Sequence, residues 1–108
     1  MFVMIVQPAT GTRDEQYHQR VKLRSDLEQH HLEVIDVLPR MDFPTGSQRL
    51  LFAVGQQICL LAQIQAVVFM HGWDQDRECR LIHSICEQYG IASYESDHLE
   101  SLYQANTD

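Results

Sequence analysis

The chain has 108 residues, 44% of them hydrophobic, and a formal net charge of −7. This length predicts one domain, residues 1–108, and the hydrophobic fraction is too high for a disordered chain. The acidic balance argues against nucleic-acid binding through a basic surface, and no apolar run is long enough to cross a bilayer.

The first apolar run, residues 2–6, is typical of a central parallel strand that is buried on both faces. A loop follows at 7–11, and helical spacing then continues to His31. Thr12 and Glu15 have the pattern of a capping box at the start of this helix. The side chains expected on its buried face are Tyr17, Val21 or Arg24, and Leu27.

A second, less buried strand is expected over 32–38, followed by a loop over 39–47. The helix expected over 48–63 is apolar nearly all round, and such a helix is buried by something. Its apolar side chains are Leu51, Phe52, Val54, Ile58, Leu61 and Ala62, and we also expect Cys59 on a core-facing side.

The run Val67–Asp74 reads VVFMHGWD and is the most informative part of the chain. It predicts a third strand over 66–70 that ends abruptly at His71, followed by the only tryptophan, Trp73. A helix over 74–89 comes next, with Gly90 as its end. A strand over 91–94 and a short helix from Ser96 or Asp97 to Tyr103 follow, and the tail from Gln104 is expected to fray. The inward residues of the helix over 74–89 are Cys79, Ile82, Ile85 and Cys86.

This alternation of strands and helices predicts an α/β, flavodoxin-like three-layer sandwich. Its four-stranded parallel sheet has the order 2-1-3-4, with helices on both faces. Ligands bind such sheets outside the carboxyl ends of the strands, where the strand order reverses. That point lies between the first and third strands, so we expect loops 8–11 and 71–76 to form one cleft.

The chemistry of this cleft has a functional and a structural interpretation at each position. The loop 8–11 offers backbone N–H groups and a hydroxyl to an anion or a sugar, but a plain turn explains it better. Trp73 is equally suited to stack on a base and to cover the end of the sheet. His71 is placed for acid–base chemistry, but no partner is visible. The candidate ligand-binding residues are Pro8, Thr10, Gly11, His71, Gly72, Trp73, Asp74 and Asp76.

No metal or other cofactor is expected. The acids Asp74, Asp76 and Glu78 stabilise the dipole of the helix that they begin, and their side chains do not converge on one ion. His30 and His31 are expected to cap a helix. Cys59, Cys79 and Cys86 lack paired ligand spacing, which makes a zinc site the weaker alternative to reduced thiols. Without a signal-peptide pattern at the start, we expect a cytoplasmic protein.

The chain resembles the nucleoside 2-deoxyribosyltransferase-like superfamily, in particular its short bacterial and phage members. The likeness rests on Pro8-Ala9-Thr10-Gly11 after the first strand, on the Gly72-Trp73 turn and on Tyr89-Gly90-Ile91, and it covers roughly the first ninety residues. The family implies the same fold, glycosyl transfer from a carboxylate nucleophile, and oligomers in which a neighbouring subunit completes the site.

The chain departs from the family at its acids. Ile82 stands where the resemblance places the nucleophile, and an alkyl group cannot replace a carboxylate. Gln57 and Gln65 stand where the family often has acids. The resemblance therefore implies a retained fold with lost chemistry. Glu78, about 6 Å earlier along the helix, is the minority catalytic candidate.

Three hypotheses follow. The leading one is a non-catalytic family member that binds a nucleoside- or nucleotide-like small molecule, or a protein partner, in the former active-site cleft. The second is an N-glycosidase or deoxyribosyltransferase that uses Glu78. The third is a homo-oligomeric interaction protein without a ligand, assembled through Leu51, Phe52 and Ile58 and through the loop 39–46 with Phe43. The orientation of four arginines relative to the cleft is left open: Arg13, Arg40, Arg77 and Arg80.

Overall fold

The computed structural model describes residues 1–35 and 47–107, and side chains from residue 51 onward in the second of these ranges. Arg40, Phe43 and most of the expected loop over 39–47 lie outside the described residues. No helix in the described part of the chain is long and apolar enough to cross a membrane.

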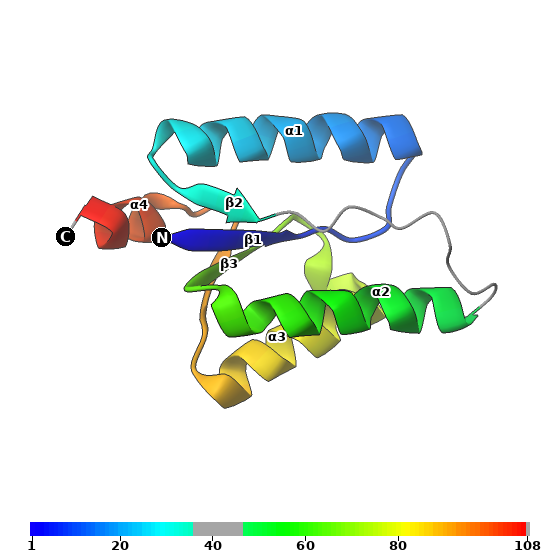
Figure 1. Cartoon of the computed structure of the whole chain (residues 1–108). Helices are drawn as coiled ribbons and strands as arrows, with labels where there is room; N and C mark the ends of the chain where they lie inside the picture. The colour runs from blue at the N-terminus through cyan, green and yellow to red at the C-terminus, as the bar shows by residue number, and fades with distance from the viewer. Residues whose placement is uncertain (36–46, 108) are drawn as a thin grey trace.

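Four parallel strands form one sheet in the order β2-β1-β3-β4, which confirms the expected topology (Figure 1). The central strand β1 places Val3 beside Val34 on one side and beside Ala66 on the other. Burial on both faces explains why β1 and β3 are continuous apolar runs. The strands are β1 (Phe2–Val6), β2 (Glu33–Ile35), β3 (Ala66–Phe69) and β4 (Ala92–Glu95).

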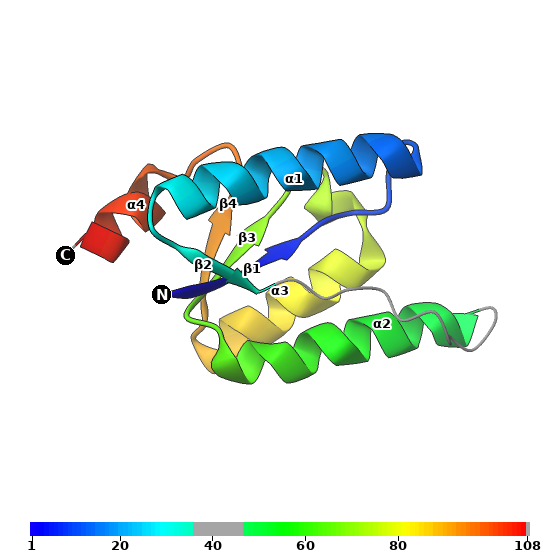
Figure 2. The ribbon, with the colours of Figure 1, turned by 45° about the horizontal axis from the view of Figure 1, so that its top comes forward.

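Helices cover both faces of the sheet, so the architecture has three layers (Figures 1 and 2). Helix α1 (Arg13–Gln29) and helix α4 (Glu100–Thr107) lie on one face. Helix α2 (Ser47–Leu60), which continues into a 3-10 turn at Leu61–Gln63, and helix α3 (Arg77–Tyr89) lie side by side on the other.

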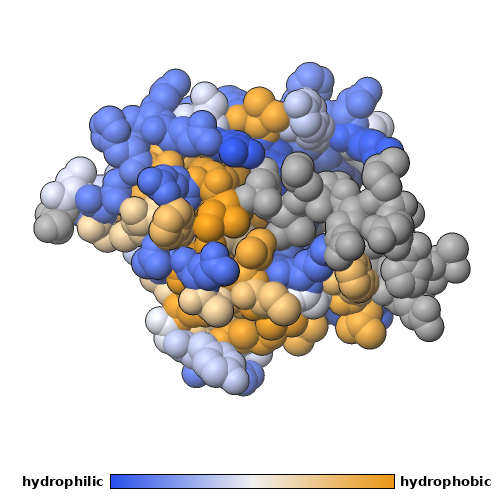
Figure 3. All heavy atoms as spheres, in the orientation of Figure 1, coloured by the Kyte–Doolittle hydropathy of each residue, from blue (hydrophilic) through white to orange (hydrophobic). Residues whose placement is uncertain are grey.

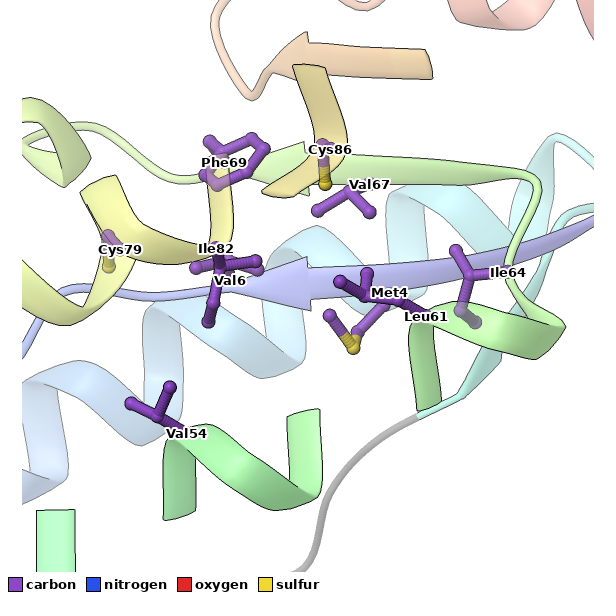
Figure 4. Packing of buried hydrophobic residues seen from close by; sticks show 10 residues of the cluster. All are labelled: Met4, Val6, Val54, Leu61, Ile64, Val67, Phe69, Cys79, Ile82 and Cys86. Atoms are coloured by element: carbon purple, nitrogen blue, oxygen red, sulfur yellow. The ribbon is translucent and has the colours of Figure 1, made fainter. Parts of the chain in front are cut away.

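Alternate residues of the strands supply two cores. Met4, Val6 and Phe69 pack against α2 and α3, as Figure 4 shows. Val3, Ile5 and Val68 point to the opposite face and pack beneath α1 and α4. This alternation follows from the two-residue period of a strand.

The buried face of α1 differs from the expectation. Leu27 is buried as expected, together with Leu23, but Tyr17 is 65% exposed and Val21 45% exposed. In the first half of the helix, the half-buried residues are the polar Gln16 and Arg20. Gln7 Nε2 donates to the Gln16 carbonyl, and Arg20 Nη2 donates to the Ile5 carbonyl at 3.4 Å. The helical period was predicted correctly. Of the residues expected on the buried face, Leu27 is buried and Arg24, the alternative to Val21, is half-buried, whereas Tyr17 is exposed.

The buried side chains among those described in helix α2 and the turn after it face the sheet and α3. Val54 and Leu61 are buried and Ile58 is half-buried. The expectation that Cys59 faces the core is wrong because it points away from the sheet and is exposed. Leu51 is 71% exposed, so the apolar composition of this helix did not predict burial all round.

The last two helices begin later than expected. A 3-10 turn, η2 (Trp73–Gln75), precedes α3, so the N-cap is Asp76 and the expected helical start at Asp74 is wrong. Gly90 ends α3 with a φ of 70°, as expected. Helix α4 extends to Thr107 instead of fraying after Tyr103, because Tyr103 stacks on His30 with ring centroids 3.6 Å apart.

His30 is the C-cap of α1, and its ring nitrogen Nδ1 lies 2.9 Å from the Asp26 carbonyl, so the expected capping role is confirmed there. The His30 carbonyl accepts a hydrogen bond from Asn106 Nδ2 of α4 at 3.0 Å. The two helices of this layer are thereby joined at their C-terminal ends.

Candidate functional site

The loops after β1 and β3 meet at the carboxyl edge of the sheet. Ala9 N donates to Asp76 Oδ2 at 3.3 Å. A Cβ added to Gly72 would lie 3.7 Å from Pro8 Cγ, so the two loops are also close together there. Gly72 has a φ of 90°, a conformation that favours glycine and turns the chain sharply after β3. Sequence reasoning placed these loops correctly relative to each other.

Asp76 joins the two loops and begins helix α3. Its Oδ1 accepts from Cys79 N at 3.0 Å as the N-cap, while its Oδ2 accepts from Ala9 N. Burial raises the pKa of this carboxyl, but the hydrogen bonds from Cys79, Ala9 and Glu78 outweigh burial and leave the pKa below its usual value. Both oxygens are therefore engaged in holding the backbone.

The loop Pro8–Gly11 is shaped by the start of α1. Thr12 and Glu15 form the expected capping box, with both reciprocal hydrogen bonds present. Gly11 has a φ of 76°, and a Cβ there would lie 2.6 Å from Glu15 Oε2. The Thr10 carbonyl accepts from Gln16 Nε2 at 3.0 Å. Helix capping is thus a sufficient physical reason for Gly11.

A hollow of about 330 Å³ opens at the carboxyl ends of β3 and β4. We call it the β3–β4 hollow. Four of the candidate residues line it, but those of the loop after β1 do not. Glu95, Ser96 and Asp97, which sequence reasoning missed, complete its wall. Its lining residues are Phe69, His71, Gly72, Trp73, Asp74, Gln75, Glu95, Ser96 and Asp97.

The indole of Trp73 is held in place from two sides. Its Nε1 donates to Glu95 Oε1 at 3.2 Å. The imidazole of His83, from α3, stacks on it with centroids 4.3 Å apart and an interplanar angle of 26°. The ring of Phe69 tilts against it, with centroids 5.2 Å apart. Trp73 therefore packs on the end of the sheet and also forms a wall of the hollow.

His71 has a partner that the sequence pattern did not reveal. Its Nδ1 lies 3.5 Å from Asp97 Oδ2, and the two side chains are 91% and 64% exposed. At this exposure, solvent screens the pair and makes it weak. The expected strand order could have indicated this contact, because pairing of β3 with β4 brings the residues that follow β4 next to those that follow β3.

A second hollow, of about 130 Å³, lies where β1, α2 and α3 meet. We call it the β1–α3 hollow. It contains Asp76 and the three α-helical positions singled out by the resemblance: Gln57, Glu78 and Ile82. Its lining residues are Val6, Gln7, Ala9, Ala53, Val54, Gln57, Asp76, Glu78, Cys79 and Ile82.

The walls of the β1–α3 hollow offer little reactive chemistry. Ile82 is 1% exposed and belongs to the hydrophobic core. The carboxylate of Glu78 pairs with Arg77 Nη2 at 3.0 Å. Burial, assisted by the nearby Asp76 and Glu78, raises the pKa of the Cys79 thiol to about 12, so this thiol stays protonated.

Gln65, where the family often has an acid, does not belong to either hollow. It precedes β3 at the amino edge of the sheet, and its Oε1 accepts from Phe2 N at 2.6 Å. Gln65 therefore does not lie at the same site as Gln57 and Ile82. Gln57 and Ile82 remain together in the β1–α3 hollow.

Among the described residues, no group of three or more His, Cys, Asp or Glu side chains is arranged to hold a metal ion. No arginine or lysine is among the described residues that line the two hollows. The comparisons with protein families, with curated proteins and with solved structures found no match to this chain. The fold class and the two hollows are therefore the basis for any functional proposal.

Proposed function

We propose that the chain binds a nucleoside-like small molecule in the β3–β4 hollow, as a nucleoside 2-deoxyribosyltransferase-like protein without the nucleophile of that family. The observation behind this proposal is a hollow of about 330 Å³ at the carboxyl edge of a parallel sheet, with a fixed indole in its wall. Small-molecule sites in α/β sheets lie at this edge, and ligand pockets begin at roughly 300 Å³.

The indole supports a planar ligand. Because Glu95 and His83 already hold Trp73, little side-chain entropy is lost when a ring stacks on it. Gly72 lets a ligand approach the backbone beside the indole closely, since no side chain stands there. Stacking on an aromatic side chain suits every purine or pyrimidine, because every base has a π face.

The charges in the wall favour an uncharged nucleoside over a nucleotide. Asp74, Glu95 and Asp97 line the hollow, and His71 is the only basic side chain among the described residues of its lining. A phosphate would meet three carboxylates there. A nucleoside avoids this repulsion, and its hydroxyl and amino groups can donate hydrogen bonds to the same carboxylates.

The residues of the β1–α3 hollow support the proposal that the chain binds its ligand without catalysing a reaction. Ile82, at the position that the resemblance assigns to the nucleophile, is a core residue. The volume of about 130 Å³ is also well below the usual range for ligand pockets. Ile82 thus lies outside the β3–β4 hollow, in which we propose that the ligand binds.

Isothermal titration with purine and pyrimidine nucleosides, their 5′-monophosphates and ADP-ribose tests the proposal. Trp73 is the only tryptophan, so its fluorescence reports binding independently. We expect saturable heat and a Trp73 fluorescence change with a nucleoside, and weaker but still measurable heat of binding in Trp73→Phe. Lack of binding by every nucleoside would overturn the proposal. Tyr17→Phe, which changes an exposed residue outside both hollows, is the matched control.

A second candidate function rests on Glu78, whose side chain is 27% exposed and lines the β1–α3 hollow beside Gln57. A carboxylate in a partly enclosed hollow is suited to N-glycoside cleavage. Release of free base from deoxynucleosides would be measured for wild type, Glu78→Gln and, as control, Glu87→Gln on the same helix. Activity lost only in Glu78→Gln favours this candidate, whereas equal activity in all three, or none, removes it.

A further inference from the structure

Carboxylates alone do not distinguish the β3–β4 hollow from the rest of the molecule. The net charge of the chain is −7, and Figure 3 shows hydrophilic residues over the α1 layer as well. The hollow differs because one of its carboxylates is bonded to an aromatic ring in the same wall. Glu95 Oε1 accepts from the indole Nε1 of Trp73 at 3.2 Å. The wall therefore combines a flat aromatic surface with a negative charge at the edge of that surface.

This pair of side chains is suited to a positively charged ring. The face of an aromatic ring attracts a cation, and the indole does so more strongly than the rings of Tyr or Phe. The hydrogen bond to Glu95 adds to this attraction, because an anion that accepts from Nε1 polarises the indole and moves electron density toward its faces. An uncharged base gains stacking from the same indole, but it lacks this electrostatic term.

One face of the indole and one oxygen of Glu95 remain for a ligand. The imidazole of His83 stacks on the indole from α3, but His83 is not among the described residues that line the hollow. The ligand would therefore stack on the face opposite His83. Glu95 Oε2 has no hydrogen-bond partner among the described residues, so it can accept from an amino or hydroxyl group of the ligand.

The other charged groups of the wall do not oppose a cation. Asp74 and Asp97 also line the hollow, and no arginine or lysine is among the described residues of its lining. His71 Nδ1 lies 3.5 Å from Asp97 Oδ2, and this exposed pair is weak. Because these carboxylates are exposed to solvent, their attraction for a cation should be moderate and should depend on salt.

We propose, on the basis of the nucleoside binding proposed above, that the β3–β4 hollow prefers a nucleoside whose base carries a positive charge. A base that is methylated on a ring nitrogen is such a ligand. Its ring stacks on Trp73, and the Glu95 carboxylate lies beside its charge. We expect such a nucleoside to bind at least about tenfold more tightly than an uncharged isomer, in line with a cation held against an indole.

Two methylated adenosines test this preference. In 1-methyladenosine the base is positively charged at neutral pH, whereas its isomer N6-methyladenosine is uncharged. Calorimetric titration of both compounds gives the ratio of their affinities. We expect the ratio to favour 1-methyladenosine at least about tenfold at about 0.01 M salt, and to fall at about 1 M salt, where exposed charges are screened. Equal affinities, or a ratio that does not change with salt, would overturn the preference.

Glu95→Gln separates the charge of this residue from its hydrogen bond. Glutamine keeps an oxygen that can accept from the indole N–H, but it has no charge. We expect the affinity ratio of the two isomers to fall by at least about threefold. Because the ratio compares two ligands of one protein, a general loss of affinity does not alter it.

Glu33→Gln is the matched control. Glu33 is an exposed acid of β2, at the other edge of the sheet, and lines neither hollow. This variant changes the net charge by the same amount and should keep the wild-type ratio. The same fall in both variants would show an effect of net charge alone and would contradict the role of Glu95. An unchanged ratio in Glu95→Gln would contradict it too.

The cation 1-methylnicotinamide and uncharged nicotinamide separate the charge preference from nucleoside binding, because neither compound has a ribose. Equal binding of the two adenosine isomers removes the charge preference and leaves nucleoside binding in place. Tighter binding of 1-methylnicotinamide than of nicotinamide, with no binding of any nucleoside, keeps the charge preference and removes the proposed function. If none of these compounds binds, both proposals are wrong.

Discussion

The β3–β4 hollow and the β1–α3 hollow both lie at the carboxyl edge of the sheet, but different kinds of side chain line them. The β3–β4 hollow has an indole, three carboxylates and an exposed histidine in its wall. The β1–α3 hollow is smaller and has core residues such as Val54 and Ile82 in its wall. Asp76 lies in the smaller one, where it caps α3 and holds the loop after β1. The carboxyl edge of this sheet therefore contains both a ligand-sized hollow and a residue, Asp76, that links α3 to the loop after β1.

A carboxylate introduced at position 82, in the smaller hollow, should have the largest effect on the stability of the fold. Ile82→Glu places a charge at a position that is 1% exposed, and we expect the free energy of unfolding to fall by about 3 kcal/mol or more. Ile82→Leu, which keeps the hydrocarbon, should cost less than about 1.5 kcal/mol. Urea unfolding measures both. A wild-type unfolding midpoint for Ile82→Glu would show that this position accepts a carboxylate and would contradict the assignment of Ile82 to the hydrophobic core.

Loss of the indole should affect the larger hollow specifically. Trp73→Ala is expected to weaken nucleoside binding by about 1 to 3 kcal/mol, the usual contribution of a base stacked on an aromatic side chain. Calorimetric titration measures this change. Glu78→Ala, in the smaller hollow, should leave the affinity unchanged. Similar losses in both variants would mean that the ligand spans the two hollows.

Removal of the Asp76 side chain should lower the stability of the fold rather than the affinity for a nucleoside. Asp76→Ala eliminates the N-cap of α3 and the bond to Ala9, and we expect a loss of about 1 kcal/mol in unfolding free energy. Asp74→Ala, which changes an exposed acid of the preceding turn, is the control for the unfolding free energy.

We also expect the effect of Asp76→Ala on stability to depend on pH. The pKa of Asp76 is lower in the folded chain than its usual value, so its ionised form stabilises the fold fully above the usual value. That contribution disappears as the pH falls through the lowered pKa. The stability difference between wild type and Asp76→Ala should therefore shrink in acid, below about pH 4. A difference that grows on acidification contradicts this assignment.

Thr10→Ala should have the smallest effect. Thr10 lines neither hollow, and its carbonyl is engaged by Gln16. We expect the nucleoside affinity to stay within about twofold, as for residues at the edge of a binding site. A tenfold loss measured by the same titration would show that the loop after β1 reaches the ligand and that both loops form one cleft.

Local sequence patterns predicted the elements well, but their rotation less well. The capping box at Thr12 and the end of α3 at Gly90 depend on neighbouring residues, and both were predicted. Tyr17 and Cys59 were placed on the wrong sides of their helices. A helix that mixes polar and apolar residues on several sides has more than one plausible buried face, and packing against the sheet decides which one is buried.

The candidate site was predicted only where it follows β3. Gly72 and Trp73 lie directly after that strand and mark the carboxyl edge in the sequence itself. Glu95 and His83 lie further along the chain and reach Trp73 only through the β3–β4 pairing and the packing of α3. Patterns within a short window contain no signal for such contacts.

The sequence by itself determined a parallel α/β sheet in the order 2-1-3-4, since alternating strands and helices with right-handed crossovers leave few other arrangements. It also determined that the turn after β3 lies at the edge where ligands bind. Only the tertiary structure decided that the β3–β4 hollow and the β1–α3 hollow are separate spaces. That division depends on where the side chains of Asp76, Trp73 and Glu95 point, and their directions are set by hydrogen bonds between residues distant in the chain.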